Sequence, residues 1–251
     1  MQAELPPLQP GTLYLVATPI GNLEDITWRA VRTLRECDVV AAEDTRRTGL
    51  LLRHLGLQKP MMSCHQHSEA RRSGDLLERL SGGGTVAYVT DAGTPGISDP
   101  GERLVRRILA AGLRVESVPG PCAAIAALSA SGLPTGEFHF IGFLPRKRGA
   151  RRNELGRLAD VPGTLVCYES PHRVKALLED LAGLWPDTPV VLSREITKKF
   201  EEHMRGTPAA ILAQLPQGGV RGECVVLVGQ SRRGGAPEVG PTPPLPLSID
   251  P

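Results

Sequence analysis

The sequence is poor in aromatic residues and almost neutral. Phe, Trp and Tyr make up 4% of the 251 residues, which disfavours a nucleic-acid interface built on rows of stacking rings. The 29 Lys and Arg residues against 27 Asp and Glu residues give a formal net charge of +2, so net charge alone indicates no polyanionic partner. Any basic surface must therefore come from local clusters.

Cysteine pairs and long apolar runs are also missing. The five cysteines are scattered and include no Cys-x-x-Cys pair, which argues against a disulfide framework and a structural zinc site and favours a reducing compartment. No apolar run reaches the roughly 18 residues of a membrane-spanning helix, and residues 1–10 lack the features of a secretory signal. We expect a cytoplasmic protein with no membrane partner and no metal.

Several common active-site motifs are absent. No G-x-G-x-x-G follows the first predicted strand, which excludes the usual dinucleotide fingerprint and the glycine-rich methyltransferase loop. The P-loop, the G-x-S-x-G elbow and the H-E-x-x-H metal motif are missing as well. The chain therefore does not match the ordinary nucleotide-binding folds.

What is present is a folded α/β pattern. Short β-type runs at residues 13–18, 38–42, 61–64, 85–90 and 113–118 alternate with helical patterns, including 26–36, 45–55 and 102–111. Asp25 is the expected N-cap of the first helix, and Gly56 the residue that closes the second. This alternation predicts right-handed crossovers and a parallel sheet in an N-terminal domain of residues 13–120.

A second α/β domain is expected over residues 121–230. A small-residue helix is followed by strands at 138–144, 164–169, 189–193 and 223–229, by a basic loop at 146–152, and by helices at 172–181 and 208–215. With more strands per helix, this domain favours a mixed sheet. Residues 1–12 are expected to form a flexible tail, and residues 231–251, rich in Pro and Gly, a disordered one.

Four loops follow predicted strands of the first domain and are rich in Gly, Pro and small polar residues. They span residues 18–25, 43–47, 91–101 and 119–123. In open α/β sheets, ligands bind beyond the carboxyl ends of the strands, and such residues let backbone approach a ligand closely. Any one of these loops alone would be a tight turn, but four together favour a binding site.

Seven stretches carry a family resemblance. LVATPIGNLEDIT, AAEDTRRTGLLLRHL, TDAGTPGISDPG, VPGPCA, FIGFLPRK, YESPHR and REITKKFEE occur in this order between residues 13 and 229. The chain thereby resembles the ribosomal RNA small subunit methyltransferase I family of the tetrapyrrole (precorrin-type) methylase superfamily. The resemblance implies a cleft for S-adenosylmethionine between two α/β domains. It also implies 2′-O-methylation of a cytidine in the decoding region of small-subunit (16S) ribosomal RNA, within an assembled subunit, by a homodimer.

The loop of residues 91–101 is the strongest candidate for the cofactor. By resemblance, five of its residues lie at or beside S-adenosylmethionine: Asp91, Gly93, Thr94, Ile97 and Ser98. Cys122 and Ala123 begin the next helix, whose N-terminus favours the carboxylate of the cofactor. Pro19 and Tyr168 complete the predicted set. A purely structural loop is the alternative.

The acceptor 2′-hydroxyl is a poor nucleophile, so the site must orient it and accept its proton. The candidate bases and orienting groups are Glu43, Asp44, His65, His67 and Glu169. The two histidines would face the same way on a short strand. A structural, hydrogen-bonded role is an equal interpretation of them, since two ligands alone make weak evidence for a metal.

Phosphate contacts are expected from three basic clusters. They comprise Arg46 and Arg47; Arg146, Lys147, Arg148, Arg151 and Arg152; and Lys198 and Lys199. Arg173, at the start of a predicted helix, is assigned to the RNA side as well. A solvated charged loop is the alternative interpretation of the central run. Two rival functions stay open: a small-molecule methyltransferase of the tetrapyrrole type, which needs no extended basic rim, and a non-catalytic RNA-binding factor on the same fold.

Overall fold

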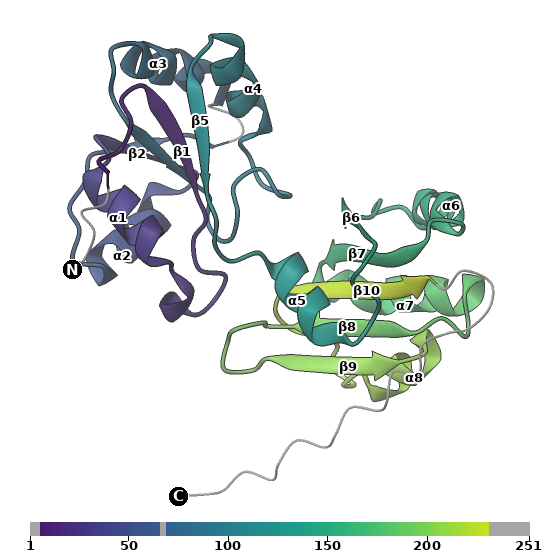
Figure 1. The fold of residues 1–251 in the computed structure, drawn as a ribbon. Helices are drawn as coiled ribbons and strands as arrows, with labels where there is room; N and C mark the ends of the chain where they lie inside the picture. The colour runs from purple at the N-terminus through teal and green to yellow at the C-terminus, as the bar shows by residue number, and fades with distance from the viewer. Residues whose placement is uncertain (1–5, 66–68, 231–251) are drawn as a thin grey trace, which may run out of the picture. The chain divides into compact units, whose positions relative to one another are not determined.

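The computed structural model describes residues 6–65 and 69–230. The chain divides into two compact units, Met1–Cys122 and Ala123–Pro251 (Figure 1). Within the described residues, no helix combines the length and the apolar character that crossing a bilayer requires.

The first unit is a parallel sheet between two pairs of helices. Its five strands have the order β3-β2-β4-β1-β5 and are β1 (Thr12–Val16), β2 (Val39–Ala42), β3 (Met61–Ser63), β4 (Val86–Val89) and β5 (Arg114–Val118). Every pairing is parallel. β2 and β4 are buried along their whole length, because helices cover both faces of the sheet.

Each face has its own apolar core. Ala30 and Leu34 of α1 (Trp28–Glu36) and Leu52 of α2 (Thr45–His54) pack on one face. Leu76 of α3 (Glu69–Ser81) and Leu104 of α4 (Glu102–Ala110) pack on the other. Successive residues of β1 alternate between the two cores, as the pleat of a strand requires.

The start of α1 corrects one expectation. Asp25 ends a short 3₁₀ turn, η1 (Leu23–Asp25), and the cap is Thr27, whose hydroxyl accepts the N–H of Ala30 at 3.1 Å. Gly56 does follow α2 as expected, with a φ of 67° that a glycine adopts without strain.

The second unit is built on a mixed sheet with the order β6-β7-β10-β8-β9. Its strands are β6 (Phe138–Phe143), β7 (Gly163–Glu169), β8 (Val190–Arg194), β9 (Glu202–Gly206) and β10 (Cys224–Gln230). β6 and β7 are parallel, whereas the other neighbours are antiparallel. The parallel sheet and the mixed sheet expected from the sequence are both confirmed.

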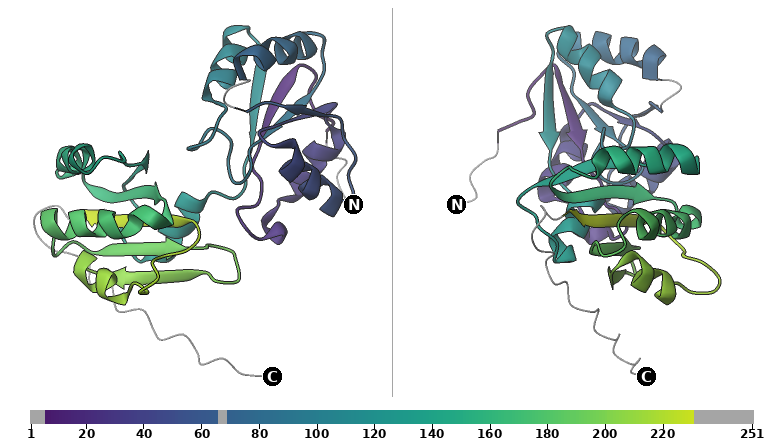
Figure 2. Two further views of the ribbon diagram at one scale, coloured as in Figure 1. Left: turned by 180° about the vertical axis from the view of Figure 1, so that it is seen from behind. Right: turned by 90° about the vertical axis from the view of Figure 1, so that its right-hand side faces the viewer.

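Helices cover both faces of the mixed sheet. α7 (Pro171–Leu184), α8 (Pro208–Gln214) and α6 (Arg148–Leu158) pack into one core around Leu178 and Val226. The small-residue helix α5 (Ala123–Ser131) lies against β7 and β10 on the opposite face (Figure 2). Two elements were not expected: the edge strand β9, and α6, which occupies most of the segment predicted as a basic loop.

Candidate active site

The loops after β1 and β4 are joined by a short antiparallel bridge. The N–H of Thr18 donates to Gly93 O at 2.9 Å, and the N–H of Gly93 donates to Thr18 O at 3.0 Å. Gly93 has a φ of 78°, and a Cβ there would lie 3.4 Å from Ile20 Cγ2. The distance is an ordinary van der Waals contact, so it is the positive φ that favours glycine at this position. Pro19, one of the predicted cofactor residues, directly follows this bridge.

The loop after β4 also connects to the loop after β5. The hydroxyl of Thr94 donates to Pro121 O at 3.0 Å, and the N–H of Ile97 donates back to Thr94 O at 3.2 Å. Ser98 adopts a φ of 62°, which is uncommon for a residue other than glycine and often marks a functional turn. The structure therefore brings the predicted residues of this loop into one folded turn beyond the sheet.

Two buried polar atoms at the end of β4 have no hydrogen-bond partner among the described residues. They are Thr90 Oγ1 and Asp91 Oδ1. Leaving such an atom unsatisfied costs about 1–3 kcal/mol, and folded proteins leave few of them. Their place beside the Thr18–Gly93 bridge fits a site that takes a polar ligand.

Glu43, directly after β2, contacts the loop that follows β4. Its Oε2 accepts the N–H of Asp91 at 3.3 Å, and Arg47 Nη1 lies 3.4 Å from Asp91 Oδ2. Burial raises the pKa of Glu43, and the nearby Asp91 carboxylate adds to that rise. A carboxylate with a raised pKa is a better proton acceptor than an ordinary one, which suits a general base.

Asp44 behaves differently, although it was predicted as a catalytic candidate. It caps α2 by accepting the N–H of Arg46 at 2.8 Å and forms an ion pair with the Arg46 guanidinium at 2.7 Å. Hydrogen bonds from Arg46 hold the pKa of Asp44 well below its usual range. Such a carboxylate stays ionised and is a weak base, so its evident task is to begin the helix.

The predicted histidine pair is only partly described. His65 follows β3 and is exposed, whereas His67 lies outside the described residues. Among the residues whose positions are given, no group of three His, Cys, Asp or Glu side chains gathers as metal ligands would.

In the second unit, Tyr168 stands at the N-terminus of α5. Its hydroxyl accepts the N–H of Ala124 at 3.2 Å, and its ring has edge contacts with Phe140 and Phe143. Cys122 and Ala123, at the start of this helix, are half-buried. Tyr168 thus contacts a helix start that was predicted to meet the cofactor, and two further aromatic rings pack against its own ring.

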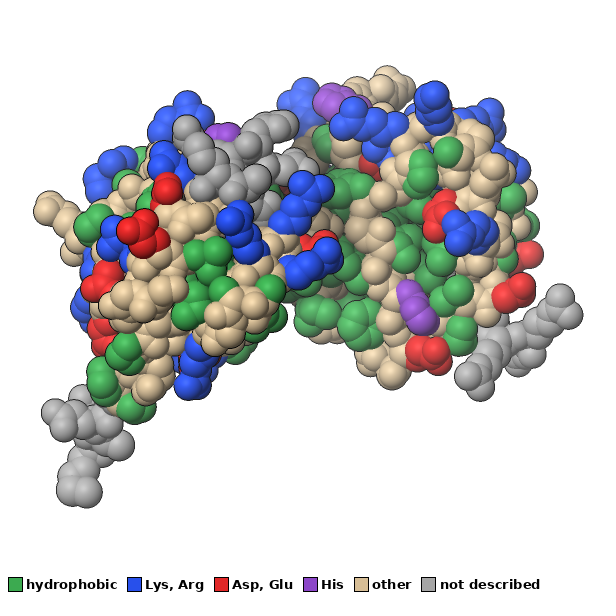
Figure 3. Space-filling model, turned by 90° about the horizontal axis from the view of Figure 1, so that it is seen from above, with side chains coloured by type: hydrophobic (Ala, Val, Ile, Leu, Met, Phe, Trp, Pro, Cys, Tyr) green, Lys and Arg blue, Asp and Glu red, His purple; other side chains and the backbone are tan. Residues whose placement is uncertain are grey.

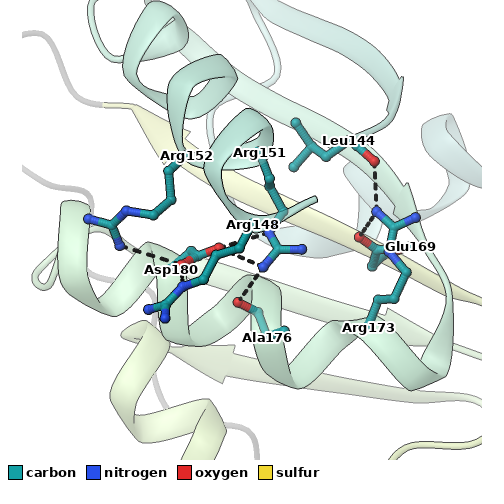
Figure 4. Close-up of polar contacts among 8 residues, drawn as sticks. All are labelled: Leu144, Arg148, Arg151, Arg152, Glu169, Arg173, Ala176 and Asp180. Carbon is teal, nitrogen blue, oxygen red and sulfur yellow. Dashed lines mark hydrogen bonds and ion pairs between the residues drawn. The ribbon is translucent and has the colours of Figure 1, made fainter. Parts of the chain in front are cut away.

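Glu169 and Arg173 form a buried ion pair (Figure 4). The carboxylate of Glu169 has no exposed surface and accepts hydrogen bonds from Arg173 Nη2 at 3.0 Å and the N–H of Ser170 at 2.7 Å. Arg173 also donates to Leu144 O at 2.6 Å, which connects the ends of β6 and β7. Burial raises the pKa of Glu169. These contacts give Glu169 and Arg173 a structural role. At the start of α7, the Ser170 side chain forms no capping hydrogen bond, and Pro171 lies in the first helical turn.

The central basic run forms the first turns of α6 and converges on one carboxylate that the sequence analysis missed. Asp180 of α7 is fully buried, and Arg148, Arg151 and Arg152 lie 3.0, 2.6 and 3.4 Å from its oxygens (Figure 4). Arg151 is 4% exposed, which corrects the expectation that it reaches RNA phosphate. An acidic residue among Leu177, Leu178 and Leu181, on the apolar face of a helix, was the available signal.

The last two predicted cations also differ from each other. Lys198 is held between Glu195 Oε1 at 2.9 Å and Glu223 Oε2 at 2.8 Å, so its charge is already compensated. Lys199 is exposed and lies 5.6 Å from the centre of the Phe200 ring. Of this pair, Lys199 is the one available to a phosphate. Figure 3 shows Lys and Arg side chains, drawn in blue, exposed at the surface of each unit.

The fold and these loops define a class of methylases. The family model for Tetrapyrrole (Corrin/Porphyrin) Methylases matches residues 12–212. A solved structure, uroporphyrin-III C-methyl transferase from Thermus thermophilus complexed with S-adenyl homocysteine, has the same fold, with a TM-score of 0.61 and 22% identity. The match covers 87% of this chain and 97% of that chain.

Curated relatives narrow the class. Ribosomal RNA small subunit methyltransferase I of Pseudomonas aeruginosa is 50% identical over 222 residues, covering 87% of this chain and 78% of the relative. The protein of the same name from Halalkalibacterium halodurans is 46% identical, covering 89% and 78%. The chain belongs to the tetrapyrrole methylase family and, within it, to the group called ribosomal RNA small subunit methyltransferase I. The resemblance stated from the sequence is thereby confirmed.

Proposed function

We propose that the protein transfers a methyl group from S-adenosylmethionine to the ribose 2′-hydroxyl of a cytidine in the decoding region of small-subunit ribosomal RNA. The observation that carries the proposal is the set of relatives at 46–50% identity that are named for this RNA. Within that proposal, the chain acts in the cytoplasm as a homodimer on an assembled small subunit.

The residues after β1, β4 and β5 fit the cofactor. The orphaned Thr90 Oγ1 and Asp91 Oδ1 offer polar contacts, and Gly93 keeps the backbone free of a Cβ beside Ile20. Exposed Ile97, at 40%, offers an apolar surface for a flat ring. The N-terminus of α5, with Cys122 and Ala123, favours a carboxylate. When bound, S-adenosylmethionine supplies an electrophilic methyl group on a positively charged sulfur.

The protein's own task is then to orient the hydroxyl and take its proton. Among the four predicted candidates that lie in the described residues, Glu43 is the base that we favour, because its pKa is raised and it contacts the backbone of Asp91. Arg47 faces Asp91 and limits the repulsion between the two carboxylates. Asp44 and Glu169 are committed to a helix cap and a buried ion pair.

RNA is held mainly through phosphates in this proposal. The contacts come from the exposed Arg46, Arg47, Arg146, Lys147, Arg148 and Lys199 and from the half-buried Arg152. A sequence with 4% aromatics relies on charge more than on stacking.

The test separates the proposal from its rivals. Isothermal calorimetry with S-adenosylmethionine should show binding; its absence in the presence and absence of RNA would favour the non-catalytic factor. Methyl-labelled cofactor is then offered to unmethylated small ribosomal subunits, to naked small-subunit RNA and to a uroporphyrinogen. Label in the tetrapyrrole and none in either RNA would favour the small-molecule enzyme and overturn the proposal.

A further inference from the structure

The cluster around Asp180 contains three positive charges and one negative charge. One buried carboxylate faces the guanidiniums of Arg148, Arg151 and Arg152, so two of the three positive charges have no counterion within the cluster. If the cluster served only to join α6 to α7, the Arg151–Asp180 pair alone would do so. The second and third arginines therefore call for a different explanation.

The three arginines use their hydrogen-bond donors unequally. Arg151 donates three bonds, from Nε and Nη2 to Asp180 Oδ2 and from Nη2 to Ala176 O. Arg148 donates one bond to Asp180 through Nε, and Arg152 donates one through Nη1. Since a guanidinium carries five N–H donors, Arg148 and Arg152 keep most of theirs for another acceptor.

Arg148 and Arg152 are also more exposed than Arg151. The side chains of Arg148 and Arg152 are 73% and 36% exposed, whereas that of Arg151 is 4% exposed. Arg148 and Arg152 both donate to the same oxygen, Asp180 Oδ1, so their guanidiniums are held close together (Figure 4). Two neighbouring guanidiniums with free donors match the oxygens of a phosphate.

We propose that Asp180 is a positioning residue that holds Arg148 and Arg152 as a two-arginine clamp for a phosphate of the substrate RNA. Arg151 fixes Asp180 in place and does not touch the RNA. The clamp rests on the proposed function, because RNA is the polyanion that it would hold.

The test compares residues on the same helix. Arg148→Gln and Arg152→Gln should each raise the RNA KM about tenfold and lower the slope of log binding constant against log salt by about one, with kcat and cofactor affinity unchanged. Arg157 is the matched control, since it is also on α6 and 79% exposed but pairs with Glu154. Arg157→Gln should leave affinity and salt slope close to those of the wild type.

Two further variants test the positioning itself. Asp180→Asn should raise the RNA KM while kcat holds in the folded fraction. If it does not fold, Arg148→Lys serves instead, because it leaves Asp180 and Arg151 in place. The lysine should restore the salt slope but not the affinity, since it keeps the charge without the planar fork.

Binding and methyl transfer are measured separately, so the two proposals fail separately. Wild-type affinity in Arg148→Lys, or an equal loss in Arg157→Gln and Arg148→Gln, would overturn the clamp. RNA binding without methyl transfer by the wild type would overturn the proposed function. The clamp would then still be judged by the RNA affinities of the variants.

Discussion

Removing the carboxylate of Asp180 should destabilise the second unit strongly. Arg151 Nη2 lies 2.6 Å from Asp180 Oδ2, and the two side chains are 4% and 0% exposed. Asp180→Asn leaves the Arg151 guanidinium buried without its counterion, which costs about 3–5 kcal/mol in comparable pairs. Arg151→Met should lower the free energy of unfolding by a smaller amount, because Asp180 still forms ion pairs with Arg148 and Arg152.

A double-mutant cycle tests this reasoning. When Asp180→Asn and Arg151→Met are combined, no charge is buried alone, so the double variant should lose less than the sum of the single losses, with a coupling of about 0.5–3 kcal/mol. The pKa of Asp180 is lowered because hydrogen bonds from the arginines outweigh its burial. Its contribution is therefore present above the ordinary pKa and is lost as pH falls through the lowered value.

Urea unfolding followed by tryptophan fluorescence is a suitable assay. The chain has two tryptophans; Trp28 is 91% exposed, whereas Trp185 packs against the core of the second unit, so the signal reports mainly on that unit. With an m-value of about 1–3 kcal/mol/M, Asp180→Asn should lower the midpoint by at least about 1 M. Asp187→Asn, at an exposed position, is the control. A loss of less than about 1 kcal/mol in the free energy of unfolding of Asp180→Asn would refute this reasoning. So would a double variant whose loss equals the sum of the two single losses.

Three further predictions concern other parts of the chain. Glu43→Gln should lower kcat about 10²–10⁴-fold with cofactor affinity unchanged, and the wild-type kcat should fall as pH drops through the raised pKa of Glu43; an equal effect of the exposed Glu36→Gln would count against it. Gly163→Ala should abolish soluble expression, because a Cβ there would lie 2.1 Å from a backbone oxygen at a φ of 86°, whereas Gly156→Ala, in open space on α6, should not. Asp38→Asn should lower the free energy of unfolding near neutral pH, because hydrogen bonds at the start of β4 lower the pKa of Asp38. The deficit should shrink as pH falls below the ordinary pKa of an aspartate; a deficit that stays constant over that fall would contradict this.

Most of the fold could be predicted because buried strands leave a clear pattern. Apolar runs such as that of β2 have both faces covered, and the glycines and prolines between elements locate the turns. The errors fall where that pattern is weak. β9 is a polar edge strand, and α6 buries little beyond Arg151 and Leu155, so its run of cations resembles a solvated loop.

The candidate site was predictable in outline and not in detail. The strand-end loops come together as the topology requires, since the carboxyl ends of parallel strands share one edge. The sequence could not show which ionisable residues are already engaged. Asp44 caps a helix, Lys198 lies between two carboxylates, and Arg151 is buried against Asp180. These partners are distant in sequence or depend on local geometry, so only the structure separates available cations from committed ones.

The identity of the methylated nucleoside tests the central claim most directly. Small ribosomal subunits lacking the modification are incubated with the protein and methyl-labelled S-adenosylmethionine, the RNA is digested, and the nucleosides are separated by mass spectrometry. We expect label in 2′-O-methylcytidine. Label confined to base-methylated nucleosides, or no label in the RNA, would contradict it.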